Sequence, residues 1–139
     1  MPEQPVSTSP DSPEADKSVT GPLTAGEARR LVARVLADHY GTGREQSVAA
    51  GDALLVASEL VTNAIRHGGG VRAFSAHVTH GELLLQVTDN NLELPHAPTS
   101  DVSRPGGFGW ALVSGASRRL DVRPLPDGTG KTVIAYLDL

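Results

Sequence analysis

Three polar residues, Glu59, Asn63 and His67, recur at intervals of four within an apolar stretch of the sequence. On an α-helix, residues at positions i and i+4 are neighbours with Cβ atoms about 5–6 Å apart, so these side chains are expected to form one row. A carboxylate beside an amide oxygen suits a hard cation with water ligands, such as the Mg²⁺ that a nucleotide carries. A solvated helix face is the alternative, and the chemistry of the residues alone favours neither.

A second candidate is Asp89, which follows the apolar run Leu-Leu-Leu-Gln-Val-Thr. A carboxylate at the end of such a strand can accept a hydrogen bond from the amino group of adenine at the edge of a sheet. An aspartate that ends a strand and starts a turn is the common alternative.

A glycine cluster forms a third candidate: Gly106, Gly107 and Gly109, with Phe108 among them, precede an apolar segment that predicts a helix. Glycines let the backbone approach a ligand closely, and a helix N-terminus offers free N–H groups and the positive end of its dipole to phosphate. A flexible loop is the alternative. Arg104 lies shortly before the cluster, where it either contacts phosphate or is an ordinary solvated arginine.

Two helices are predicted ahead of these sites. Thr24 and Glu27 form a capping box that begins the first helix. Apolar residues then follow at helical spacing: Ala28, Leu31, Val32, Val35 and Leu36. Gly41 and Gly43 end this helix. A second, strongly apolar helix is predicted over residues 45–66, and the glycines at positions 68–70 stop it.

The rest of the chain predicts mainly strands. The elements expected there are strands over residues 71–79 and 82–88, a helix over 109–119, and strands over 120–123 and 131–137. His80 and Gly81 predict a two-residue turn between the first two strands. Residues 90–105 lack periodicity and form a long loop, which compact domains seldom keep without a use. This order of helices and strands predicts an α+β fold.

The composition fits one domain, since the chain has 139 residues. Residues 1–21 are rich in proline and serine, so we expect a disordered tail before a domain at residues 22–139. The absence of cysteine excludes disulfides and thiolate metal sites. A net charge of −4 and 4% aromatic residues argue against a nucleic-acid surface. The longest apolar run covers residues 53–57, so we expect no membrane span, no signal peptide and a cytoplasmic location.

Residues 59–67 resemble the N-box of GHKL ATP-binding domains, the histidine-kinase-like ATPases, at every position of the pattern Glu-Leu-x-x-Asn-Ala-x-x-His. The resemblance implies that Asn63 chelates Mg²⁺, that Glu59 acts as or positions the general base, and that His67 lies in the nucleotide site. It also implies that Asp89 is the adenine-reading aspartate of the first glycine box. The glycines of that box are replaced here, and Asn91 is expected to make the left-handed turn in their place.

The glycine cluster is similar to the second glycine box of the same family. This resemblance implies that Gly107, Phe108 and Gly109 contribute to phosphate binding. The long loop before them then corresponds to the ATP lid, and Arg104 is a candidate phosphate contact within it.

The start of the final strand carries one more implied contact, because a threonine there commonly assists adenine binding in GHKL domains. Thr132 is the candidate, and Lys131 beside it is expected to be solvated. Residues 128–132 read Gly-Thr-Gly-Lys-Thr and superficially resemble a phosphate-binding P-loop. A P-loop requires a helix after the lysine, whereas a strand is predicted here, so we reject that interpretation.

Within the family, the chain is most similar to single-domain anti-sigma factor serine/threonine kinases. The resemblance implies a Bergerat-type two-layer α/β sandwich, with helices packed on one face of a mixed, mainly antiparallel sheet. It also implies ATP and Mg²⁺ as cofactors.

The expected partners are an anti-anti-sigma protein of the STAS type, phosphorylated on Ser or Thr, and a sigma factor that the domain sequesters. A homodimer is compatible with this expectation, and neither nucleic acid nor membrane is an expected partner. Two alternatives stay open. The altered first glycine box favours a non-catalytic nucleotide- or partner-binding module, and a plain ATPase is the other.

Overall fold

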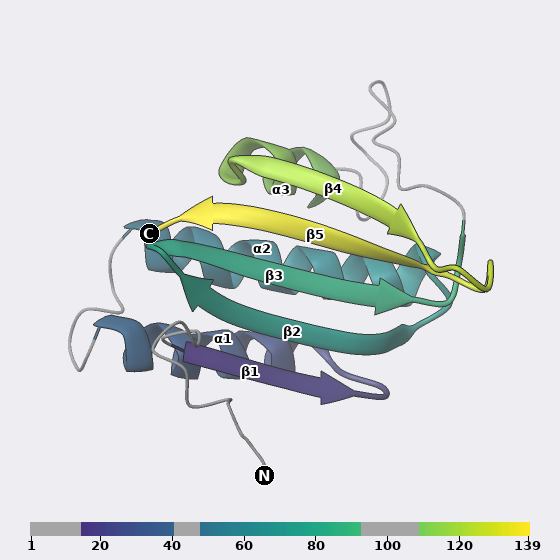
Figure 1. The fold of residues 1–139 in the computed structure, drawn as a ribbon, viewed down its shortest axis with the longest axis horizontal. Helices are drawn as coiled ribbons and strands as arrows, with labels where there is room; N and C mark the ends of the chain where they lie inside the picture. The colour runs from purple at the N-terminus through teal and green to yellow at the C-terminus, as the bar shows by residue number, and fades with distance from the viewer. Residues whose placement is uncertain (1–14, 41–47, 93–108) are drawn as a thin grey trace, which may run out of the picture.

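The computed structural model describes residues 15–40, 48–92 and 109–139. In chain order its elements are β1 (Ala15–Thr20), α1 (Ala25–Tyr40), α2 (Val48–His67), β2 (Val71–Thr79), β3 (Glu82–Asp89), α3 (Gly109–Ala116), β4 (Arg119–Pro124) and β5 (Lys131–Asp138). The strands form a sheet in the order β1-β2-β3-β5-β4, and each neighbouring pair is antiparallel. The helices cover one face of this sheet (Figure 1), which confirms the predicted two-layer α+β fold, but the described sheet is wholly antiparallel and not mixed as predicted.

The predicted capping box begins α1. The backbone N–H of Thr24 donates to Oε1 of Glu27 at 2.8 Å, and the N–H of Glu27 donates to Oγ1 of Thr24 at 3.1 Å. Two N–H groups that lack a partner inside the helix are thereby satisfied. The apolar residues predicted for the buried face are all buried: Ala28, Leu31, Val32, Val35 and Leu36.

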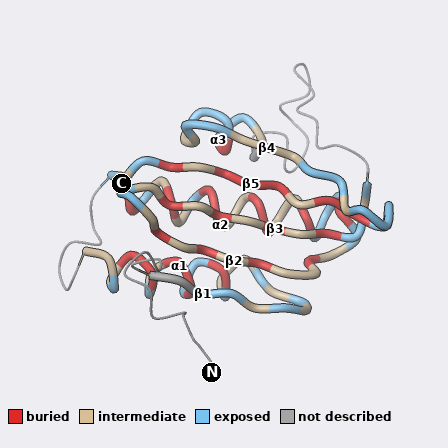
Figure 2. The backbone as a smooth tube through the Cα atoms, in the orientation of Figure 1, coloured by how far each residue is buried: buried red, intermediate tan, exposed pale blue. Residues whose placement is uncertain are grey.

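The central helix is α2, which lies behind the middle strands of the sheet (Figure 1). Its buried residues are mostly small or branched: Ala50, Ala53, Val56, Ala57, Leu60, Val61 and Ala64. Figure 2 shows this burial along α2 and along the strands in front of it. By length and apolar composition alone, α2 could also cross a membrane, as the core helix of a globular fold often could.

The glycines after α2 end the helix as predicted. The N–H groups of Gly68 and Gly70 both donate to the carbonyl oxygen of Ala64, at 3.0 and 2.9 Å. Gly69 and Gly70 have φ angles of 72° and 107°, a backbone region that residues with a side chain seldom adopt. The chain therefore leaves the helix sharply and enters β2.

The β2–β3 hairpin has the predicted two-residue turn. His80 and Gly81 have φ angles of 54° and 74°, as a type I′ turn requires. Along β2 the residues Phe74, Ala76 and Val78 are buried, as the alternating pattern predicts. This turn fixes the register of β2 against β3.

The predicted tail is wrong at its C-terminal end, because Ala15–Thr20 is the edge strand β1, paired with β2. Val19 lies opposite Phe74 and packs against the hydrophobic core. The segment ADKSVT has a single large apolar residue, so its place in the sheet depends on backbone pairing with β2. Hydropathy patterns do not encode such pairing. Residues 1–14 of the predicted tail lie outside the described residues.

Two further boundaries differ from the prediction. The helix α3 ends at Ala116 instead of residue 119, because Arg119 already begins β4, opposite Tyr136 of β5. The predicted loop over residues 90–105 is described as far as Leu92, and its remainder lies outside the described residues.

Candidate functional site

The predicted polar row lies on the C-terminal half of α2. Glu59 and Asn63 are half-buried, whereas His67 at the end of the helix is exposed. Leu60 and Ala64 beside them belong to the core, so the row follows the margin of the packed face. Within the described part of the chain, the side chains of Glu59 and Asn63 have no hydrogen-bond or ion-pair partner. Their oxygen atoms are therefore available to a ligand.

Asp89 at the end of β3 is buried and forms an ion pair with Lys131 at the start of β5. The Nζ atom of Lys131 lies 2.9 Å from Oδ2 of Asp89, and the two side chains are each 5% exposed. The same Nζ donates to the carbonyl oxygen of Asn91 at 2.8 Å. The expectation that Lys131 is solvated is therefore wrong.

Two glycines make room for this aspartate. A Cβ atom added at Gly68 would lie 2.5 Å from Oδ2 of Asp89, and one added at Gly130 would overlap its backbone oxygen. Both glycines are therefore required by the close packing around Asp89. Neither glycine has a positive φ angle, so the requirement is one of space.

Asn91, which stands at the first glycine position of the first box, and Asn90 before it have structural roles. The backbone N–H of Asn91 donates to Oδ1 of Asp89 at 3.0 Å, and its side-chain Nδ2 donates to the carbonyl oxygen of His67 at 2.7 Å. The backbone N–H of Asn90 donates to the carbonyl oxygen of Gly68 at 2.8 Å. Among the described residues other than glycine, His80 alone has a positive φ angle, so the left-handed turn expected of Asn91 is wrong. Asn91 instead fastens the end of β3 to the end of α2.

The structure does not bring Thr132 to Asp89. The hydroxyl groups of Thr132 and Thr88 are hydrogen-bonded to each other, with their oxygen atoms 2.8 Å apart. Successive residues of a strand point to opposite faces, so Thr132 faces away from the side on which Lys131 meets Asp89. Thr132 therefore lies on the other face of the sheet from the ion pair, and its contact with adenine stays a prediction.

A signal for Lys131 was present in the sequence. In β5 the residues Val133, Ala135 and Leu137 are buried, and Lys131 precedes them at the same period of two. Extending the alternation by one step places Lys131 on the buried face, where a charged group requires a partner. Asp89 lies directly opposite Lys131 in the register of β3 and β5.

The predicted phosphate-binding residues are only partly described. Arg104, Gly107 and Phe108 lie outside the described residues, and Gly109 is the first residue of α3. The helix α3 packs beside α2, and its Val113 is fully buried.

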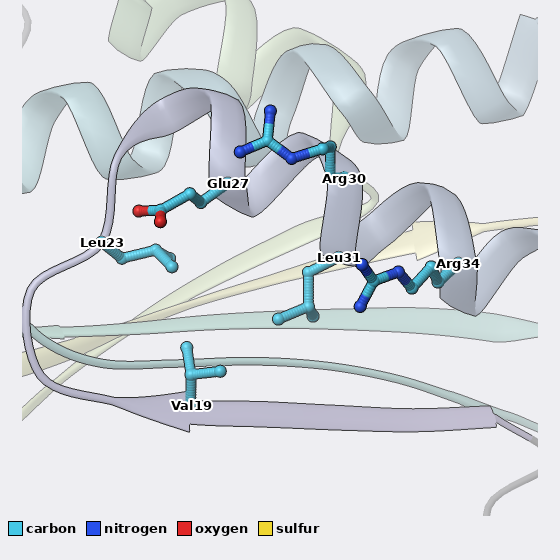
Figure 3. Close-up of a pocket in the computed structure, with 6 residues that line it drawn as sticks. All are labelled: Val19, Leu23, Glu27, Arg30, Leu31 and Arg34. Carbon is cyan, nitrogen blue, oxygen red and sulfur yellow. The ribbon is translucent and has the colours of Figure 1, made fainter.

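A separate pocket of about 300 Å³ lies between β1 and α1 (Figure 3). Val19 points from β1 toward Leu31 of α1, and Arg30 and Arg34 lie along the helix above them. The lining includes none of the residues predicted for the nucleotide site, so this pocket is a different feature of the molecule.

Residues 22–137 match the family model described as the histidine kinase-like ATPase domain. The chain belongs to this family. The search of curated proteins found no match to this chain.

Among solved structures, this ATPase domain is similar to the histidine kinase domain from the Erythrobacter litoralis EL346 blue-light activated histidine kinase. That match has 24% identity and a TM-score of 0.49, and it covers 86% of this chain and 64% of that one. A second structure of the same blue-light activated kinase has 26% identity and a TM-score of 0.50, with 85% of this chain and 42% of that chain covered. The chain thus spans less than two thirds of either structure.

The residues of this ATPase domain fit a nucleotide that carries Mg²⁺. Glu59 and Asn63 supply a carboxylate and an amide oxygen without internal partners among the described residues. A carboxylate offers about four acceptor positions, and Asp89 uses two of them for Lys131 and Asn91. The described residues include no cluster of three or more His, Cys, Asp or Glu that would hold a metal by itself. The arrangement suits Mg²⁺ that is bound together with phosphate oxygens.

Proposed function

We propose that this domain is a serine/threonine kinase of the anti-sigma type, which binds Mg-ATP and phosphorylates a STAS-type anti-anti-sigma protein. The observation that carries the proposal is the pair Glu59 and Asn63, adjacent on α2, half-buried and without internal partners in the described chain. Membership of the histidine kinase-like ATPase family supports the ATP-binding part.

Each residue of the pair has its own role in this proposal. The amide oxygen of Asn63 holds Mg²⁺. The carboxylate of Glu59 accepts the proton of the partner's Ser or Thr hydroxyl, whose oxygen takes the γ-phosphoryl group while ADP leaves. Such a transfer depends mostly on positioning and charge neutralisation, which a fixed helix face provides.

The remaining sites complete the proposal. Asp89 reads the base, and Gly107, Phe108 and Gly109 bind phosphate together with Arg104. We further propose that the domain acts in the cytoplasm, as a monomer or homodimer, and sequesters a sigma factor when the STAS-type partner is absent. These partners are proposed from the resemblance of the chain to single-domain anti-sigma kinases.

A second candidate function is a binding module that does not transfer phosphate. It is favoured by the ion pair of Asp89 with Lys131, because the carboxylate expected to read the base already has two internal hydrogen bonds. A nucleotide bound under these conditions would regulate partner binding without phosphoryl transfer.

The test is incubation with ATP labelled on its γ-phosphate and a candidate STAS-type partner. We expect label on the partner, and Glu59→Gln should lower its rate by roughly 10²–10⁴-fold, the usual effect of a lost acid–base group. The Kd for Mg-ATP should stay unchanged in this variant. Asp52→Asn is the matched control, since it removes another half-buried carboxylate from α2.

The position of the label separates the alternatives. Label released as free phosphate would identify a plain ATPase. Bound ATP without transfer to any partner would support the binding module. Equal transfer by the unaltered chain and by Glu59→Gln would remove Glu59 from the role of base.

A further inference from the structure

The buried ion pair of Asp89 and Lys131 places a cation at the carboxylate that is proposed to read the base. The two side chains are equally buried, at 5% exposed each, and their charged atoms lie 2.9 Å apart. A ligand group that reaches Oδ2 of Asp89 therefore also meets Nζ of Lys131. The inference below rests on the proposed function, because it concerns how that nucleotide site distinguishes bases.

The ammonium of Lys131 has hydrogen-bonding capacity to spare. An ammonium carries three N–H donors. Within the described residues, Lys131 uses two acceptors, Oδ2 of Asp89 and the carbonyl oxygen of Asn91. A buried donor without an acceptor is unfavourable, so an acceptor on a bound ligand would be stabilised there.

Purine bases differ in what they present at position 6. Adenine carries an amino group, which donates, whereas guanine carries an oxygen, which accepts. Hypoxanthine, the base of ITP, carries the same oxygen. A carboxylate alone accepts a hydrogen bond from the amino group of adenine but repels the oxygen of a 6-oxopurine. An ammonium beside the carboxylate donates a hydrogen bond to that oxygen, so the repulsion is replaced by attraction.

We propose that Asp89 and Lys131 together read position 6 of a purine, so that the domain binds 6-oxopurine nucleotides as well as ATP. The amino group of adenine donates to Asp89, and the oxygen of a 6-oxopurine accepts from Lys131. Lys131 is thereby a specificity-determining residue.

The first test uses the unaltered chain with three nucleotides in the presence of Mg²⁺: ATP, ITP, and purine riboside triphosphate, which has hydrogen at position 6. Calorimetry should give a Kd for ITP within about tenfold of that for ATP. Purine riboside triphosphate should bind about tenfold or more weakly than both, because it loses the hydrogen bond at this position. Binding of ATP with ITP more than about 100-fold weaker would overturn the inference and leave the proposed function standing. Binding of none of the three would overturn both.

The second test uses Lys131→Met, with Lys17→Met as the matched control. The chain has these two lysines, and Lys17 is exposed on β1. Lys131→Met should weaken ITP binding about 10- to 100-fold more than ATP binding, and the control should change neither. Equal losses for both nucleotides in a folded Lys131→Met variant would assign Lys131 a structural role only and overturn the inference. If circular dichroism shows that this variant is unfolded, the three-nucleotide comparison decides.

Discussion

The side-chain Nδ2 of Asn91 donates to the carbonyl oxygen of His67 at 2.7 Å. This hydrogen bond joins the segment after β3 to the last residue of α2. Because the N–H of the same asparagine donates to Asp89 at 3.0 Å, the carboxylate that we propose to read the base is tied to the helix that carries Glu59 and Asn63. The candidate base site and the candidate Mg²⁺ site are therefore parts of one hydrogen-bonded unit.

Replacing Lys131 with methionine should destabilise the fold. The change leaves the carboxylate of Asp89, whose side chain is 5% exposed, without its cationic partner. Removing one member of a buried ion pair costs about 3–5 kcal/mol. The free energy of unfolding, measured by urea denaturation, is expected to fall by about this amount.

A double variant separates the lost charge partner from lost packing. Asp89→Asn together with Lys131→Met removes both charges and should recover most of the stability, since replacing a buried pair entirely is often neutral. Equal instability of the single and double variants would show that packing, and not the unpaired charge, is the cause.

Gly68→Ala should also destabilise the fold, because the new Cβ atom would lie 2.5 Å from Oδ2 of Asp89. Overpacking of this kind costs about 1–3 kcal/mol. Gly51→Ala is the matched control: an added Cβ there meets no atom within 4 Å, and Gly51 lies within α2. The control should raise stability by about 1 kcal/mol through helix propensity. Thermal unfolding measures the stability of both variants. A Gly68→Ala variant as stable as the unaltered chain would contradict the close packing around Asp89.

Asn63→Ala should weaken nucleotide binding that depends on Mg²⁺, by roughly tenfold, while the fold persists. The fold persists because alanine favours a helix more than asparagine does. Calorimetric titration with ATP, in Mg²⁺ and again in EDTA, measures the effect. Thr62→Ala, at the neighbouring half-buried position, is the control and should bind like the unaltered chain. An Asn63→Ala variant with the same Mg²⁺ dependence as the control would remove Asn63 from the metal site.

The capping box should give α1 a pH-dependent stability. The backbone N–H of Thr24 hydrogen-bonds the carboxylate of Glu27 and lowers the pKa of Glu27 below its ordinary value. A group whose pKa is lower in the folded state stabilises the fold above its unfolded pKa, and this stabilisation is lost as the pH falls through the folded pKa. In Glu27→Gln the titrating group is absent. The difference in Tm between the unaltered chain and this variant is therefore expected to shrink in acid, and a constant difference from neutral to acidic pH would contradict the capping role.

Local rules in the sequence accounted for much of the fold. The capping box of Thr24 and Glu27, the glycine stop after α2 and the turn at His80 and Gly81 each depend on residues close together in the chain. Such features can be recognised from spacing and residue type. The polar row of Glu59 and Asn63 is local in the same sense, since helical periodicity alone places these side chains together.

The features that escaped prediction depend on contacts between distant segments. The strand β1 exists because its backbone pairs with β2, more than fifty residues further along the chain. The burial of Lys131 depends on Asp89, and the capping of α2 depends on Asn91. Residue types at these positions are compatible with several environments, and the register between β3 and β5 decides among them.

The crowding around Asp89 has an evolutionary consequence. Gly68, Gly130 and Lys131 all contact this aspartate or lie where any added atom would strike it, so a mutation at one position changes what the others tolerate. In related chains that lack the lysine at position 131, we expect either another hydrogen-bond donor near the aspartate at position 89 or a residue without a carboxylate at that position. A side chain in place of Gly68 should coincide with a smaller residue in place of Asp89. Across the lineage, these positions are expected to covary as a group, and the lineages that keep the lysine are the ones expected to retain a broader choice of purine.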